Sequence, residues 1–240
     1  MRFGFLVGVV TFLSSSLFAG DVWREKPYQD WCEKDVRKIL NESPWAKRVE
    51  IETKEQSSVV RGGGEEISSG SEGGGDNEGN SGEEGRDENR GAVVFVVRWA
   101  SSRTMREAWV RGEVLQKRVA AADTTKFLPP PSDDSQLVVA GGNMGAFEKE
   151  DESTLRDKSV LLRTRSKQKI TPSAVQVVRS PDGKKIRAIV FHFQKSLLLN
   201  EPTSATTDDH DLKFVIHTVT TEIKAGFDLE RMVDNEGLDL

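Results

Sequence analysis

The stretch 55–91 interrupts the chain with a composition that cannot form a hydrophobic core. Residues 61–91 hold eleven of the protein's 21 glycines, nine acidic residues and three arginines, a net charge of -6, and their one aliphatic residue is Ile67. Such a segment buries too little apolar surface to offset the entropy of ordering it. We therefore predict a disordered Gly/Glu-rich linker over 55–91, with the folded structure built from the sequence on either side.

Residues 1–19 have the order of parts found in a secretory signal peptide. Arg2 precedes an uncharged apolar run from Phe3 to Leu13, three serines follow, and Ala19 is small enough for a cleavage site. The apolar run is short for the roughly 20 residues that span a bilayer, so an uncleaved anchor is the alternative. We expect export to a periplasmic or extracellular location, with membrane attachment only if this segment is retained.

Composition excludes several classes of protein. The 240 residues carry 34 Lys and Arg against 39 Asp and Glu, a formal charge of -5, whereas generic nucleic-acid binders are basic. A single cysteine, Cys32, excludes a disulfide scaffold and a cysteine-cluster metal site. Its apolar neighbours on the expected helix favour a small buried residue over a reactive or intermolecularly paired thiol.

The folded sequence divides into a short unit before the linker and a longer one after it. The unit 20–54 contains apolar residues at helical spacing over 26–42 and alternating residues over 48–53, which predict one helix and one strand. We expect both to pack on the main domain, 92–240.

The main domain combines hairpins with helices. Thr104 and Glu107 fit an S/T-x-x-E cap at the start of a helix predicted over 104–122, and a weaker helix is predicted over 151–164. Strands are predicted at 92–100, 136–140, 175–178, 185–193, 212–219 and 222–229. This order predicts an α+β fold, a mixed or antiparallel sheet layered with two or three helices and interrupted by the disordered insert.

Four phrases share a pattern with other proteins: KPYQDW at 26–31, SPWAK at 43–47, VVRWASSRTMREAW at 96–109 and FDLERMVDNEGLDL at 227–240. They resemble an uncharacterised family of exported acidobacterial proteins, whose counterparts read SPWA, RW-S-x-P-x-R-E-A and F-x-L-x-x-M-x-x-x-G-x-L-x-L. Arg103-Thr104 stands here where that family tends to have proline. The resemblance implies export and a shared fold, and it implies no activity.

Arginines and tryptophans gather where the strand 92–100 passes into the helix 104–122. Arginine beside aromatic rings is typical of binding surfaces. The alternative is that Trp99 and Trp109 are core residues. The candidate ligand-binding residues are Arg98, Trp99, Arg103, Arg106 and Trp109.

A second candidate site lies in a basic run. Residues 156–169 carry six basic residues against Asp157, a net charge of +5. Such a run can contact phosphates or anionic headgroups, or attract the acidic linker of the same chain, and the alternative is a solvated surface. The candidate anion-binding residues are Arg163, Arg165, Lys167 and Lys169.

No catalytic arrangement stands out. The histidines His192, His210 and His217 lack the H-E-x-x-H spacing of a zinc site, and no G-x-S-x-G elbow is present. Because Asp208, Asp209 and Asp211 surround His210, a metal-assisted hydrolase is the alternative, although an acidic turn explains the same residues. We expect a non-enzymatic binding or assembly module of the periplasm or cell envelope. Its expected partner is a protein or envelope component, without a cofactor or specific nucleic acid.

Overall fold

The computed structural model describes residues 21–52, 92–199, 210–219 and 221–240. The predicted signal peptide at 1–19 and the predicted linker at 55–91 lie outside these residues. The strands that flank the linker, β1 (Ala46–Glu52) and β2 (Ala92–Trp99), pair antiparallel along their whole length, with Glu52 opposite Ala92. The chain therefore returns to the sheet beside the point at which it leaves.

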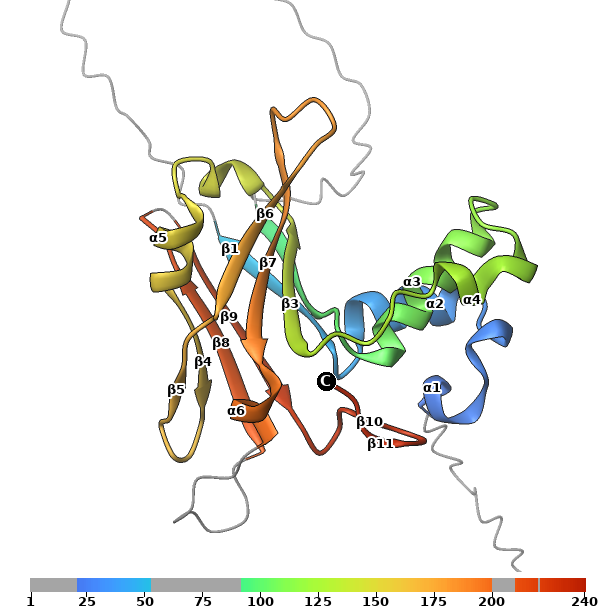
Figure 1. The fold of residues 1–240 in the computed structure, drawn as a ribbon. Coiled ribbons are helices and arrows are strands. Elements are labelled where there is room, and N and C mark those ends of the chain that lie inside the picture. The colour runs from blue at the N-terminus through green and yellow to red at the C-terminus, as the bar shows by residue number, and fades with distance from the viewer. Residues whose placement is uncertain (1–20, 53–91, 200–209, 220) are drawn as a thin grey trace, which may run out of the picture.

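Most described strands belong to two antiparallel sheets (Figure 1). The five-stranded sheet has the order β1-β2-β3-β7-β6, and the four-stranded sheet has the order β5-β4-β8-β9. The remaining bounds in the five-stranded sheet are β3 (Asp134–Gly141), β6 (Ala174–Arg179) and β7 (Ile186–Gln194). Those in the four-stranded sheet are β4 (Ser159–Arg163), β5 (Lys169–Ile170), β8 (Asp211–His217) and β9 (Glu222–Asp228).

The two sheets pack face to face through alternating side chains. Alternation buries Leu212, Phe214 and Ile216 of β8, because successive residues of a strand point to opposite faces. Phe214 contacts Phe191 and Phe193 of β7, with ring centroids 5.1 and 6.4 Å apart. Buried aromatic pairs of this kind contribute about 0.5–1.5 kcal/mol beyond their buried area. A large part of the core therefore lies between the sheets, and the rest continues under the helices.

The longer helices form a separate group at one end of the five-stranded sheet (Figure 1). α2 (Glu33–Glu42) packs against α3 (Arg103–Leu115). The helices approach closely at Gly112 of α3, where an added Cβ would lie 3.5 Å from Val36 Cγ1 of α2. The shorter described elements are α1 (Val22–Glu25), α4 (Thr124–Phe127), α5 (Glu152–Asp157), α6 (Lys195–Leu199) and the hairpin strands β10 (Val233–Asp234) and β11 (Gly237–Leu238). Three 3-10 turns complete them at Tyr28–Asp30, Ala121–Asp123 and Met144–Phe147.

The α+β class predicted from the sequence is confirmed, and the hairpins predicted at 175–193 and 212–229 correspond to β6-β7 and β8-β9. The helix predicted over 151–164 is wrong beyond Asp157, because the residues that follow pair with β8 as strand β4. The helix predicted over 104–122 ends at Leu115, where Lys117 takes a left-handed φ of 58°.

The N-terminal unit also departs from its sequence pattern. The helix predicted over 26–42 begins at Glu33, after a 3-10 turn at Tyr28–Asp30. Cys32, predicted to be buried, is exposed. It stands immediately before α2, where its backbone N–H donates to the Asp35 carboxylate at 3.0 Å.

Candidate functional site

The site begins where β2 turns into α3. Ser102 is the N-cap of α3, and its hydroxyl accepts a hydrogen bond from the Met105 N–H at 3.2 Å. The preceding Ser101 hydroxyl accepts the Gln136 N–H of β3 at 3.0 Å. The predicted cap at Thr104 is therefore two residues too late. At this turn α3 leaves the five-stranded sheet, and a space remains between the helix and the sheet.

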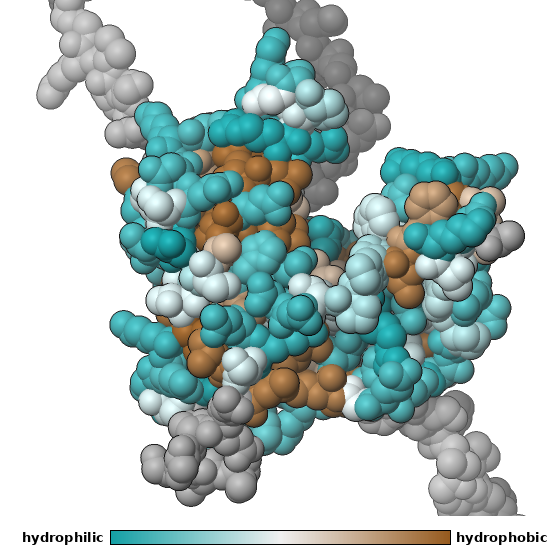
Figure 2. Space-filling view, viewed as in Figure 1, coloured by the Kyte–Doolittle hydropathy of each residue, from teal (hydrophilic) through white to brown (hydrophobic). Residues whose placement is uncertain are grey.

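That space is a groove of about 500 Å³, which we call the α3 groove. In Figure 2 the surface is indented between the sheets and the helical group. Three of the predicted ligand-binding residues line the groove: Arg98, Arg106 and Trp109. Its apolar lining includes Leu40, Met105, Pro129, Pro130 and Val138, and none of its lining residues is acidic.

Arg98 closes the end of the groove that lies against α2. Its Nε donates to the Leu40 carbonyl at 2.6 Å and its Nη2 to the Asn41 side-chain oxygen at 3.0 Å. A cation at the carboxyl end of a helix also complements the helix dipole. Burial lowers the pKa of Arg98, and no carboxylate of the described residues lies within 4.0 Å of it.

Arg106 joins α3 to the proline-rich loop on the far side of the groove. Its Nε donates to the Ser101 carbonyl at 3.2 Å and its Nη1 to the Pro129 carbonyl at 2.5 Å. Trp109, one helical turn further along α3, is 52 % exposed, while the other four tryptophans are buried. The alternative that Trp109 is a core residue is therefore wrong.

The other two predicted residues do not reach the groove. Trp99 is fully buried between the sheets, with its ring centroid 5.3 Å from that of Phe227. Arg103 turns toward the C-terminal residues 233–240, which we call the tail. Its Nε donates to the Asp234 carboxylate at 3.0 Å, and its Nη1 forms an ion pair with Glu236.

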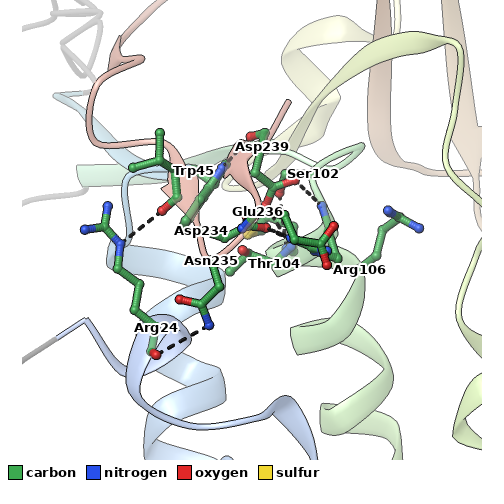
Figure 3. Close-up of polar contacts among 12 residues, drawn as sticks. Arg24, Trp45, Ser102, Thr104, Arg106, Asp234, Asn235, Glu236 and Asp239 are labelled. Atoms are coloured by element: carbon green, nitrogen blue, oxygen red, sulfur yellow. Dashed lines mark hydrogen bonds and ion pairs between the residues drawn. The ribbon is translucent and has the colours of Figure 1, made fainter.

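The tail also caps α3. The carboxylate of Asp239, only 8 % exposed, accepts the backbone N–H groups of Arg103 and Thr104 at 2.5 and 2.9 Å. Figure 3 shows Asp234, Glu236 and Asp239 gathered at the start of α3, with Arg106 directed away from them. These three acids are not among the residues predicted for the site, although they belong to the phrase 227–240 that the sequence shares with the family it resembles.

The tail holds the N-terminal segment as well. The Trp45 indole donates to the Asp239 carbonyl at 2.7 Å, and Arg24 Nε donates to the Val233 carbonyl at 3.2 Å. The side-chain Nδ2 of Asn235 donates a hydrogen bond of 3.5 Å to the Arg24 carbonyl (Figure 3). The two ends of the described chain are therefore joined at α3.

Burial divides the basic run into one buried and three exposed candidate residues. Arg163 is 3 % exposed, and its Nη2 donates to the Leu198 carbonyl of α6 at 2.7 Å. Arg165, Lys167 and Lys169 are exposed along the turn between β4 and β5 and on β5 itself. Lys167 has a left-handed φ of 60°, and its Nζ donates to the Thr164 carbonyl at 2.6 Å.

The histidines are not brought into one cluster. His210 Nε2 lies 3.4 Å from Glu230, and the neighbouring Asp208 and Asp209 lie outside the described residues. His192 faces Asp134 at 3.9 Å on the five-stranded sheet, while His217 faces Glu222 at 3.2 Å on the four-stranded sheet. Within the described ranges, no group of three or more His, Cys, Asp or Glu is arranged to hold a metal ion.

Two further findings concern the chain as a whole. In the part of the chain that the structure describes, no helix combines the length and apolar character needed to cross a membrane. Comparison with protein-family models, with curated proteins and with solved structures finds no match.

Proposed function

We propose that this protein is an exported, non-enzymatic binding module whose α3 groove binds an apolar ligand that carries a negative charge. One observation carries the proposal: Arg98 and Arg106 line a groove that is otherwise largely apolar and has no acidic lining residue. A volume of about 500 Å³ lies in the usual range of roughly 300–1,000 Å³ for small-molecule sites.

The two arginines favour an anion because each retains unused donors. A guanidinium has five N–H groups. The contacts of Arg98 and of Arg106 with other described residues use two of its nitrogens in each case. A carboxylate, sulfate or phosphate in the groove would form charge-assisted hydrogen bonds with the remaining N–H groups.

The lining of the groove favours an apolar body on that anion. Met105, Val138 and Pro130 offer hydrocarbon surface, and the exposed ring of Trp109 offers a face. Burying apolar ligand surface here contributes roughly 25 cal/mol per Å². The ligand class is therefore an anionic amphiphile, which is a chemistry available among envelope components.

Export is part of the same proposal. The charged, apolar and small-residue order of 1–19 supports it, and so does the resemblance to exported acidobacterial proteins. A periplasmic or extracellular binding module would meet envelope amphiphiles directly.

Octanoate binding to the purified protein tests the proposed function. Trp109 is the one tryptophan of five that is exposed, so the neutral quencher acrylamide reports mainly on it. We expect octanoate to protect the tryptophan emission from acrylamide and octan-1-ol to protect it much less. Arg106→Gln should weaken octanoate binding about tenfold, the loss typical of one charge-assisted hydrogen bond.

Arg111→Gln is the matched control. Arg111 lies on the same helix, but its Nε donates to the Trp31 carbonyl at 2.7 Å and it does not line the groove. This variant removes the same charge and should bind octanoate as the parent does. Equal binding of octanoate and octan-1-ol, or equal losses in the two arginine variants, would contradict the proposal.

A further inference from the structure

A second and smaller pocket, of about 200 Å³, lies against a different face of α3. Three distant parts of the chain form its walls: the N-terminal segment with Tyr28 and Trp31, the helix with Glu107, and the tail with Asp234 and Glu236. Arg103 and Glu107, four residues apart on α3, line this pocket, whereas Arg106 and Trp109 line the α3 groove, and no described residue lines both. The pocket is therefore separate from the α3 groove.

Glu107 is the unsatisfied group of this pocket. Its carboxylate is half-buried, and it has no hydrogen bond or ion pair with any other described residue. Burial raises the pKa of Glu107 to about 7. Asp239 and Asp234 support this rise, while the charges of Arg103 and Arg106 oppose it. A half-buried carboxylate without a partner among the described residues carries part of the desolvation cost of burial, which a cationic ligand would offset.

Aromatic rings line the pocket on the side of the N-terminal segment. Tyr28 and Trp31 meet edge to face, with ring centroids 6.4 Å apart and planes at 71°, and Tyr28 is only half-buried. Trp23 of α1 extends the same wall. The face of an aromatic ring attracts a cation, by about 0.5–1 kcal/mol at exposed sites.

The remaining charges of the lining also favour a cation. Lys26 and Arg103 are positive, while Glu107, Asp234 and Glu236 are negative, so the lining has two positive charges against three negative ones. Arg103 is engaged by both tail acids, and Lys26 Nζ lies 3.6 Å from the Asp35 carboxylate. Glu107 is the lining acid that takes part in none of these pairs.

We propose that this pocket is a second binding site, which takes a primary ammonium group between the Glu107 carboxylate and the half-buried ring of Tyr28, which the buried ring of Trp31 supports from behind. The ammonium group donates a hydrogen bond to Glu107 and lies against the ring of Tyr28. The pocket volume admits the amine end of a small molecule or of a flexible chain, rather than a folded surface.

The test uses propylammonium chloride as the probe, with sodium chloride at matched ionic strength as the reference. The pKa of Glu107 is followed by carbon NMR of its side-chain carboxyl group in the full chain. A bound cation stabilises the ionised form, so saturating propylammonium should lower the pKa of Glu107 by about one unit or more. The ring signals of Tyr28 should shift over the same concentration range.

Two variants and one analogue make the result decisive. Glu107→Gln should weaken propylammonium binding at least tenfold, and Tyr28→Leu by about two- to fivefold. Glu113→Gln, which removes an acid of the same helix that pairs with Arg118 and does not line the pocket, is the matched control and should bind within twofold of the parent. An unchanged pKa of Glu107, or tetramethylammonium binding as tightly as propylammonium, would overturn the proposal.

Discussion

The two faces of α3 carry similar residues in opposite electrostatic settings. On one face, Arg103 is neutralised by the tail acids Asp234 and Glu236. On the other face, the hydrogen bonds of Arg106 within the described residues all go to backbone carbonyls, and Trp109 is exposed beside it. The difference teaches that an arginine's position on a helix does not establish its role. The segment that folds against each face determines whether the charge is used in structure or remains for a ligand.

The largest expected effect is on the face of α3 that the tail covers. Asp239→Ala removes the carboxylate that accepts the Arg103 and Thr104 N–H groups. Because these first-turn donors are left unpaired in a partly buried position, we expect the free energy of unfolding to fall by about 2–3 kcal/mol. Urea unfolding measures this loss. Glu236→Ala, which truncates an exposed acid, is the control and should change the free energy of unfolding by less than about 0.5 kcal/mol. Similar losses in both variants would contradict the role of Asp239 as the cap of α3.

An intermediate effect is expected at Glu107 and depends on pH. Its pKa of about 7 in the folded protein exceeds the value of about 4.3 expected for an unfolded chain. As pH rises through this window, the unfolded chain ionises first, so Glu107 opposes folding increasingly. Glu107→Gln should therefore be more stable than the parent at pH 8, by about 1–2 kcal/mol after allowance for solvent screening, and equal to it at pH 4.

Urea unfolding of both proteins across this pH range provides the measurement. A constant difference between them at every pH would show that Glu107 titrates normally. That result would mean that the pocket holds no carboxylate with a raised pKa to set against the arginines of the α3 groove.

The smallest effect is expected on the open face. Trp109→Ser should change the free energy of unfolding by less than about 0.5 kcal/mol, because the side chain is 52 % exposed. The same variant should lose most of the acrylamide-accessible tryptophan emission, measured by steady-state quenching. A loss of stability above about 1 kcal/mol would instead place Trp109 in the packing between α3 and its neighbours.

Part of the candidate site follows from sequence periodicity. Arg98 and Trp99 are consecutive residues of β2, so they necessarily point to opposite faces of the sheet, one toward the groove and one into the core. Likewise, Arg103 and Arg106 are three residues apart on α3, yet different chain segments cover their surroundings. The sequence shows that arginine and tryptophan gather at this junction, but it does not show that the core takes Trp99 and that two separate pockets divide the other four residues.

The strand β4 shows why local pattern failed elsewhere. Residues 159–163 form a short apolar run that suits a helix or a strand equally well. Pairing with β8, from Ser159 opposite Ile216 to Arg163 opposite Leu212, selects the strand. The partner lies about fifty residues further along the chain, so no local window contains the information.

The sequence by itself determined the α+β class, because alternating and helical periodicities are local consequences of backbone geometry. It also located the hairpin turn at Ser180–Gly183, where Gly183 has a left-handed φ of 71°. Only the tertiary structure decided that the strands form two packed sheets and that the tail caps α3 and covers one of its faces. Those outcomes depend on contacts between residues far apart in the chain, such as Trp45 and Arg103 with Asp239, whose free energy appears only when the whole chain is folded.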